Sequence, residues 1–152
     1  MEINIIRTDS SNPHFQHLVN HLDKYLAYID GDEHGFYAQF NNIDVLRHTV
    51  VLYQDNLPGS CGAFKALDDK TAEIKRMYTI TTARGKGLAS RVLHELECWA
   101  KDLGYTSCKL ETGKRMAEAV NFYRKQGYRV VPNYGQYEGI ENSICFEKSL
   151  ST

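Results

Sequence analysis

The hydrophobic pattern of the chain changes its period at Arg84, and this change constrains the fold more than any other feature. Before it, residues 49–53, 61–67 and 71–80 are short apolar segments separated by turn residues, which is the pattern of consecutive antiparallel strands. After it, apolar side chains recur at three- and four-residue steps up to Leu103. That spacing predicts a long amphipathic helix. The chain therefore combines a meander of three strands with a helix that begins directly after the last of them.

The segments on either side extend this pattern. Asn12 is suited to cap a first helix and Pro13 to begin it. The expected elements outside the meander are a strand at 3–7, a helix at 13–29, the long helix at 88–103, a strand at 107–110, a helix at 116–126, and strands at 128–131 and 143–148. The order β-α-β-β-β-α-β-α-β-β indicates an α/β fold with a mixed, mostly antiparallel sheet flanked by helices. Strands joined by a helix are expected to be parallel, and those joined by a hairpin antiparallel.

Length and composition favour one domain without a metal or a disulfide framework. A chain of 152 residues buries roughly 68–70% of its unfolded surface, and no linker or repeat interrupts it, so we expect a single domain over residues 1–152. The net charge of −1 argues against a protein that coats nucleic acid or a membrane surface. No apolar run is long enough for a membrane span, and we expect a cytoplasmic protein. The four cysteines form no C-x-x-C pair, which indicates reduced thiols.

The segment Arg84-Gly85-Lys86-Gly87-Leu88-Ala89 carries the strongest chemical signal. Glycines at a strand-to-helix junction let the backbone approach a ligand, and the free N–H groups of a helix start favour an anion such as pyrophosphate. A tight turn with solvated basic residues is the simpler alternative. A Walker A loop is excluded because Gly87 stands where Ser or Thr is needed. A dinucleotide fingerprint is excluded because Ser90 stands where its third glycine belongs.

Three segments together resemble the GNAT superfamily of N-acetyltransferases. Residues 84–89 match the R-G-x-G-x-G/A form of its acetyl-CoA loop, and residues 72–80 resemble the strand before that loop. Residues 119–128 resemble the family segment A-x-x-F-Y-x-x-x-G-F. The resemblance implies the family fold and acetyl-CoA as co-substrate, with no metal. One position departs from the family, since Met116 stands where an asparagine often contacts pantetheine.

The resemblance also implies catalytic residues. An amine attacks only when it is neutral, and a lysine-like amine titrates near pH 10.4, so a base or a selective site is needed. Glu73 is the first candidate and Glu111 the alternative, although Glu73 could instead be a strand carboxylate paired with Lys75 or Arg76. Tyr123 is expected to stabilise the leaving thiolate, with a core tyrosine as the alternative. The residues expected to bind acetyl-CoA are Met77, Tyr78, Thr79, Arg84, Gly85, Lys86, Gly87, Leu88, Ala89, Asn121 and Tyr123.

The acceptor is the least determined part of this interpretation. We expect a small-molecule or amino-acid-like amine, bound by the first helix, residues 30–46 and a loop that carries Tyr134 and Tyr137. The same loop is a candidate homodimer contact. His14, His17 and His21 share one helical face, and we favour a polar surface there over a metal site. The function expected is N-acetyl transfer to a primary amine, and the alternative is a non-catalytic acyl-CoA-binding sensor or interaction module.

Overall fold

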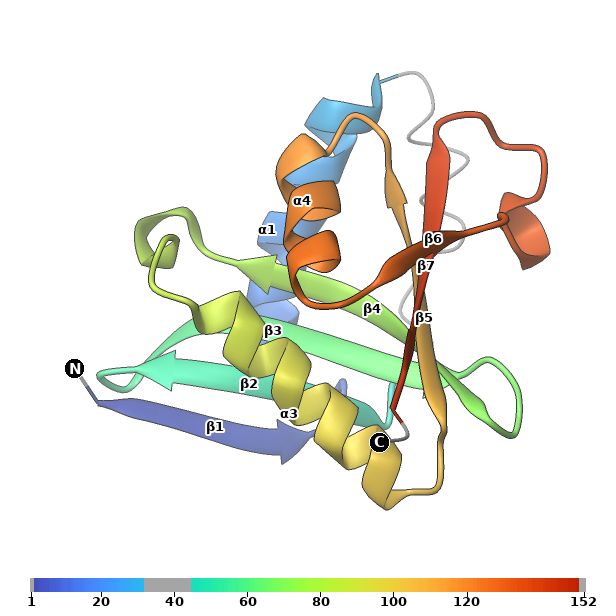
Figure 1. The fold of residues 1–152 in the computed structure, drawn as a ribbon. Coiled ribbons are helices and arrows are strands. Elements are labelled where there is room, and N and C mark those ends of the chain that lie inside the picture. The colour runs from blue at the N-terminus through green and yellow to red at the C-terminus, as the bar shows by residue number, and fades with distance from the viewer. Residues whose placement is uncertain (1, 32–44, 151–152) are drawn as a thin grey trace.

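A computed structural model describes residues 2–31 and 45–150 of the chain (Figure 1). Its strands are β1 (Ile3–Thr8), β2 (His48–Gln54), β3 (Leu57–Ala66), β4 (Thr71–Thr79), β5 (Ser107–Gly113), β6 (Arg129–Val131) and β7 (Ser143–Ser149). Its helices are α1 (Pro13–Asp30), α3 (Leu88–Asp102) and α4 (Ala117–Lys125), with 3-10 turns η2 (Thr81–Ala83) and η3 (Gly135–Tyr137). None of these helices combines the length and apolar character needed to cross a membrane.

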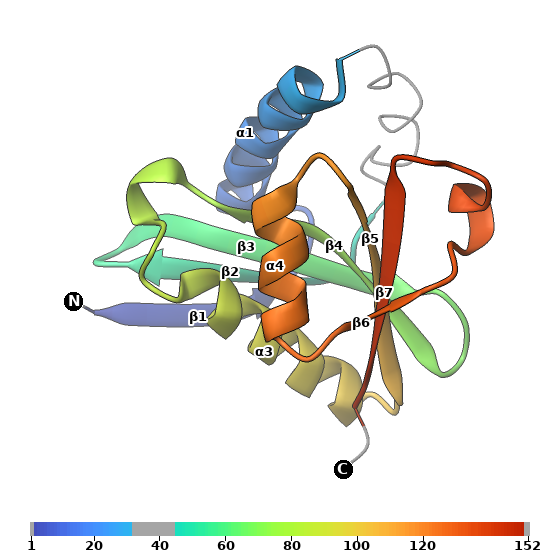
Figure 2. The ribbon, with the colours of Figure 1, turned by 45° about the horizontal axis from the view of Figure 1, so that its top comes forward.

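The strands form one mixed sheet in the order β1-β2-β3-β4-β5-β7-β6. The pair β4 and β5 is parallel, and the other neighbouring pairs are antiparallel. Figures 1 and 2 show α1 and α3 on opposite faces of the first four strands, with α4 on the same side as α3. The predicted fold class is therefore confirmed: an α/β fold with a mixed, mostly antiparallel sheet flanked by helices.

Alternating side chains of the central strands divide the core between the two faces. Val50, Leu52 and Phe64 pack with the apolar stripe of α3. Val51 and Ala63, one residue out of phase, pack instead with Phe15, Leu18 and Val19 of α1. Because side chains alternate along a strand with period two, Glu73 and Lys75 point to the α1 face.

The strands β4 and β5 pair only at their beginnings. Their ladder joins Thr71–Glu73 to Ser107–Lys109, and β4 then continues to Thr79 without a partner from β5. In the same stretch Gly62 of β3 faces two residues of β4, Arg76 and Met77, because the register shifts between Cys61 and Ala63. This is a β-bulge, and Arg76 takes a positive φ of 60° within it. The bulge and the divergence open a gap in the sheet beside α4.

Two local predictions are wrong. The turn expected over residues 55–59 is only Asp55 and Asn56, both with positive φ (51° and 69°), so β3 already begins at Leu57. Two such residues form the compact hairpin turn whose twist matches the strands. The strand expected at 107–110 continues to Gly113, because β7 pairs with it along its whole length.

A third correction concerns the direction of β1 and β2. They are joined by α1 and were expected to be parallel, but they pair antiparallel. The reason is that the connection leaves and returns at the same end of the sheet. Ser10 N donates to Leu46 O at 2.8 Å, and Leu46 N donates to Ser10 Oγ at 3.0 Å, which closes the connection beside the Thr8 and Thr49 pair.

The segment expected at 30–46 to bind the acceptor is described only in part, because residues 32–44 lie outside the described residues.

Candidate active site

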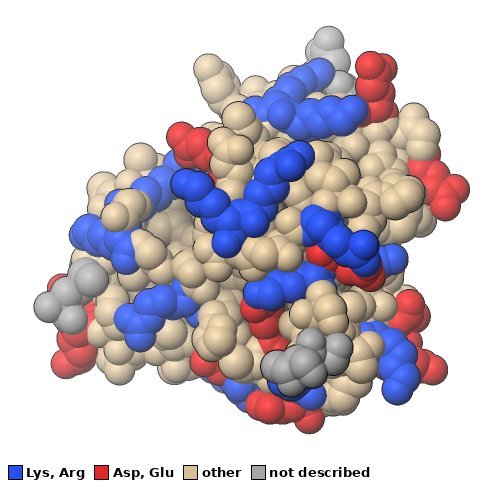
Figure 3. All heavy atoms as spheres, viewed as in Figure 1, with Lys and Arg blue, Asp and Glu red and all other residues tan. Residues whose placement is uncertain are grey.

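A cavity of about 640 Å³ runs between the unpaired end of β4, the loop before α3, and α4. Figure 3 shows basic side chains gathered over the face that α3 and α4 present. The lining of the cavity includes these predicted cofactor residues: Met77, Tyr78, Thr79, Arg84, Gly85, Gly87, Leu88, Ala89 and Tyr123. Lys86 and Asn121 line neither this cavity nor the smaller one beside it. Most of the predicted cofactor residues therefore surround one elongated cavity.

The loop before α3 presents backbone donors at one end of this cavity. Gly85 and Gly87 take positive φ angles of 80° and 76°, which residues with a Cβ rarely adopt. Gly87 is the N-cap of α3, where no side chain of the described residues makes a cap bond and no acidic residue lies in the first turn. The N–H groups of the first turn are thus left for an anion.

Arg84 is held at the wall of the larger cavity by contacts that leave part of its guanidinium available. Its Nε donates to the carbonyl oxygen of Thr79 at 3.0 Å. Its guanidinium lies 5.8 Å from the ring centre of Tyr25 and 5.7 Å from that of Tyr78. These contacts bridge α1 and β4, and within residues 2–31 and 45–150 they leave the Nη groups without a hydrogen bond, so these groups can meet an anion.

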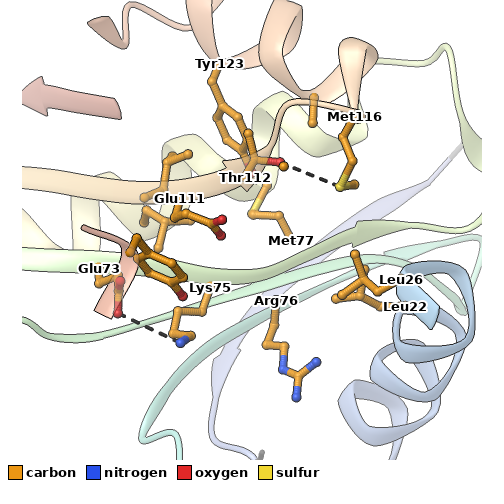
Figure 4. Close-up of a pocket in the computed structure, with 15 residues that line it drawn as sticks. Leu22, Leu26, Glu73, Lys75, Arg76, Met77, Glu111, Thr112, Met116 and Tyr123 are labelled. Atoms are coloured by element: carbon orange, nitrogen blue, oxygen red, sulfur yellow. Dashed lines mark hydrogen bonds and ion pairs between the residues drawn. The ribbon is translucent and has the colours of Figure 1, made fainter. Parts of the chain in front are cut away.

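A smaller cavity of about 140 Å³ lies in the gap between β4 and β5 (Figure 4). It shares five lining residues with the larger one: Leu22, Met77, Met116, Ala119 and Tyr123. Both candidate carboxylates, Glu73 and Glu111, line it as well. Figure 4 shows Glu73 and Lys75 at one end, Tyr123 and Met116 at the other, and Glu111 between them. All three predicted catalytic residues therefore meet around one cavity that adjoins the larger one.

Tyr123 lies on α4 at the junction of the two cavities. It is 8% exposed and packs edge-on against Phe122 and Tyr128, with ring centres 5.1 and 5.8 Å away. Burial raises the pKa of its phenol, so the hydroxyl remains protonated near neutral pH. Tyr123 therefore packs as a core tyrosine, which was the alternative expected from the sequence. Its protonated hydroxyl is also a potential hydrogen-bond donor at the junction of the two cavities.

The two carboxylates differ in their surroundings. Glu73 is 3% exposed and accepts a hydrogen bond from Tyr134 Oη at 2.7 Å, while Lys75 Nζ lies 3.9 Å from its other oxygen. Glu111 is only partly buried and accepts a hydrogen bond from Ser143 Oγ at 2.7 Å. The expected alternative for Glu73, a pairing with Lys75, is present, but at a distance longer than a direct hydrogen bond.

Lys75 contributes a buried cation to the smaller cavity. Its side chain is 11% exposed. Burial lowers the pKa of its amine, and the charge of Glu73 opposes that shift.

Some lining residues carried no site signal in the sequence. Leu22 and Leu26 of α1 face the smaller cavity, but their spacing alone indicates only a core stripe. The charged residues Arg115 and Glu118 line the larger cavity at the start of α4. They belong to no recognisable motif, and only the fold brings them to the site.

The histidines of α1 do not form a common centre. His14 Nδ1 lies 2.7 Å from Tyr53 Oη, the rings of His17 and His21 meet edge-on at 4.7 Å, and His21 stacks at 6.4 Å on Tyr78. No three His, Cys, Asp or Glu side chains within 2–31 and 45–150 are grouped so as to hold a metal ion.

Comparison with known proteins identifies the family. The model of the Acetyltransferase (GNAT) family matches residues 13–128. The IAA acetyltransferase of Azospirillum brasilense is 31% identical over 137 residues, 88% of each chain. The uncharacterized N-acetyltransferase YsnE of Bacillus subtilis (strain 168) is 35% identical over 98 residues, 63% of this chain and 64% of that one.

Solved structures share the fold at lower identity. A Klebsiella pneumoniae structure described as an acyl-CoA N-acyltransferase has a TM-score of 0.82 at 23% identity, covering 98% of both chains. A GNAT acetyltransferase of Elizabethkingia anophelis with acetyl-CoA bound has a TM-score of 0.68 at 16% identity, covering 97% of both chains. The family match covers most of the chain, and it favours an enzyme over a non-catalytic binding module. The chain belongs to the GNAT family and is an acyl-CoA-dependent acetyltransferase.

Proposed function

We propose that this enzyme, with residues 1–152 as one catalytic domain, transfers the acetyl group of acetyl-CoA to a primary amine of a small molecule. Acetyl-CoA occupies the larger cavity, and the acceptor amine enters the smaller one. The observation that carries this proposal is the position of Tyr123, which lines both cavities and so lies where the two substrates meet.

The larger cavity suits acetyl-CoA along its length. The first turn of α3, with Arg84 beside it, receives the pyrophosphate. Beyond the bulge, β4 has no partner from β5, so pantetheine can meet the backbone of Met77 and the N–H of Thr79, whose carbonyl oxygen accepts from Arg84 Nε. The thioester then lies at Tyr123, next to the smaller cavity. Met116 lines both cavities, and it supplies an apolar contact where many family members have asparagine.

The smaller cavity favours a short aliphatic amine. Its volume of about 140 Å³ is small, and Leu22 and Leu26 form an apolar wall. The opposite wall carries Glu73 and Glu111, whose charges attract an ammonium group. Two cations line the cavity too, but the guanidinium of Arg76 is bound to Asp23, and the amine of Lys75 lies 3.9 Å from Glu73 Oε1. A compact amine with a short apolar stem matches both walls.

The reaction follows from these positions. The ammonium of the acceptor loses a proton to Glu73, directly or through water, with Glu111 as the alternative base. The neutral nitrogen attacks the carbonyl carbon of the thioester, and a C–N bond forms. The tetrahedral intermediate collapses as the C–S bond breaks, and the second proton of the nitrogen is lost to water, because the base already holds the first. The hydroxyl of Tyr123 donates a hydrogen bond or its proton to the leaving sulfur, so that free CoA thiol and the acetamide result.

Release of CoA thiol with a panel of short alkyl amines, diamines and amino acids tests this function. We expect turnover with short amines, and Tyr123→Phe should lower kcat with little change in the KM for acetyl-CoA. Tyr105→Phe is the matched control, because that phenol packs against Phe64 on the α3 face. Equal kcat in Tyr123→Phe and the parent enzyme would contradict the role of Tyr123. Turnover confined to peptide or protein lysines would contradict the small acceptor.

A further inference from the structure

A tyrosine from the loop between β6 and β7 contacts the candidate base directly. Tyr134 Oη donates to Glu73 Oε2 at 2.7 Å, across 61 residues of sequence. Glu73 is 3% exposed, so this contact accounts for one of the two oxygens of a buried carboxylate. The other oxygen faces Lys75 Nζ at 3.9 Å. Of these two contacts to Glu73, the one from Tyr134 is the shorter and is a direct hydrogen bond.

The loop is built so that Tyr134 is held in place. Asn133 Nδ2 lies 3.1 Å from each of three backbone carbonyl oxygens, those of Tyr137, Ile140 and Ser143. These contacts tie the start of the loop to its end. The ring of Tyr134 packs edge-on against Tyr137 at 5.9 Å, and Tyr137 is 4% exposed and lines the smaller cavity. The Tyr134 hydroxyl is thus fixed relative to β4 by a loop that also forms part of the cavity wall.

The direction of the hydrogen bond is also determined. Burial raises the pKa of the Tyr134 phenol, and the negative charge of Glu73 raises it further. The phenol is therefore protonated over the working pH range, and it donates to a carboxylate that accepts. Lys109 Nζ, 5.4 Å from the ring centre of Tyr134, adds a cation over the face of the same ring.

We propose that Tyr134 is a positioning residue for the reaction, which holds the carboxylate of Glu73 through Oε2 and so leaves Oε1, the oxygen 3.9 Å from Lys75 Nζ, to accept the proton of the acceptor amine. This inference rests on the proposed function, in which Glu73 is the base. A glutamate side chain has three rotatable bonds, and the Tyr134 hydrogen bond removes much of that freedom on the side away from the acceptor. Tyr134 does not touch the reacting atoms, and its effect passes through Glu73.

Several charged and titratable groups surround Glu73 and affect the pH dependence of the reaction rate. They are Lys65 on β3, Lys75 and Arg76 on β4, Lys109 and Glu111 on β5, Cys145 on β7, and Tyr134 and Tyr137 in the loop. Among them, Tyr134 makes a short neutral-donor hydrogen bond to Glu73.

The test compares Tyr134→Phe, Glu73→Gln and the double variant by CoA thiol release over a range of pH. Tyr134→Phe should lower kcat roughly tenfold and leave the KM for acetyl-CoA unchanged. In the Glu73→Gln background the second change should cause no further loss, because the group that Tyr134 positions is gone. Asn133→Ala keeps the phenol and loosens the loop, and it should lower kcat in the same direction. Tyr105→Phe again serves as the control.

The outcomes separate this inference from the proposed function. If Glu73→Gln keeps full activity, Glu73 is not the base, and both proposals about it are overturned. If Glu73→Gln is impaired while Tyr134→Phe keeps the parental kcat and pH profile, only the positioning role is overturned. Losses that multiply in the double variant also overturn the positioning role. If Tyr134→Phe fails to fold, Asn133→Ala replaces it in the test, and its kcat is compared alone and in the Glu73→Gln background in the same way.

Discussion

Arg76 in the bulge of β4 donates through Nη1 to Asp23 on α1, and this contact ties the helix to the strand at the edge of the smaller cavity. The guanidinium side chain is 4% exposed, whereas that of Asp23 is 45% exposed. Arg76 is also the bulge residue with φ of 60°. A backbone conformation that costs free energy in a residue with a Cβ is therefore held by a side-chain contact from another element.

Replacing Asp23 with alanine should destabilise the fold and weaken acceptor binding. The buried guanidinium would lose this partner, and we expect the free energy of unfolding to fall by about 1–2 kcal/mol, because Asp23 is partly solvated. Since α1 supplies Leu22 and Leu26 to the cavity, the KM for the acceptor should rise several-fold. Urea denaturation and steady-state kinetics measure the two effects. Lys24→Ala, at an exposed neighbour, is the control, and equal effects of the two changes would contradict this role of the pair.

Gly62 lies opposite the bulge and cannot carry a side chain without displacing Met77. An added Cβ would lie 2.4 Å from Met77 Sδ and 2.8 Å from Leu96 Cδ1. Gly62→Ala should therefore lower the free energy of unfolding by about 1–3 kcal/mol. It should also raise the KM for acetyl-CoA, because Met77 lines both cavities.

Gly59→Ala is the matched control for that change, because it lies on the same strand and its added Cβ would meet nothing closer than 3.6 Å. We expect a change in unfolding free energy within about 0.5 kcal/mol there. Thermal and urea unfolding of the two variants make the comparison. If Gly62→Ala were as stable as Gly59→Ala, the close packing at the bulge would be refuted.

The order of the elements was predictable because each has a clear hydrophobic period. Leu88 to Leu103 repeat with the helical period, and α3 covers Leu88–Asp102. The antiparallel direction of β1 and β2 was not predictable, because it depends on the Ser10 and Leu46 contacts that close the connection. The bulge was not predictable from the sequence either, because arginine is not a residue type that is enriched at positive φ, and yet Arg76 adopts it.

The candidate site was predictable as far as its motifs extend. Tyr123 and Glu73 belong to segments that resemble the family, and the fold brings them to one cavity. Tyr134 and Ser143 contact the two carboxylates from the C-terminal loop and β7. The sequence indicates Tyr134 only as part of a candidate acceptor loop. Its hydrogen bond to Glu73 was not predictable, because it joins segments that are far apart in the chain.

Arg84 and Lys86 are expected to differ in their effect on acetyl-CoA binding, although both belong to the same loop. Arg84 lines the larger cavity and is fixed by Thr79, whereas Lys86 lines neither cavity. Arg84→Ala should weaken binding by about 1.5–3 kcal/mol, which is roughly tenfold or more in Kd. Lys86→Ala should cost less than about fivefold, as for a solvated charge.

Titration calorimetry with CoA at low and moderate salt measures these losses. The loss in Arg84→Ala should persist at moderate salt, and the loss in Lys86→Ala should largely disappear, because salt screens exposed charges. Equal losses in the two variants at both salt concentrations would show that the cavity lining does not distinguish them.

His48 links the pH dependence of stability to the α3 face of the sheet. Its ring stacks on Phe64 at 4.8 Å with an interplanar angle of 4°, and it meets Trp99 edge-on at 5.0 Å. Burial lowers the pKa of His48, and the neighbouring charge of Arg47 lowers it further. The folded protein therefore favours the neutral ring, and the unfolded chain binds a proton more readily.

Lowering the pH should accordingly remove a stabilising contribution of His48. The contribution is fully present above the unfolded pKa of about 6.5 and is lost as the pH falls from there through the lower pKa of the folded state. Urea denaturation at several pH values between about 7.5 and 5 measures the slope of unfolding free energy against pH. We expect His48→Asn to be less stable at every pH, because the stacking is lost, but to have a smaller slope than the parent. His94→Asn, at an exposed histidine of α3, should leave the slope closer to that of the parent. If His48→Asn keeps the parental slope, the stability change over this range arises from other groups, and the neutral stacked ring of His48 does not contribute to it.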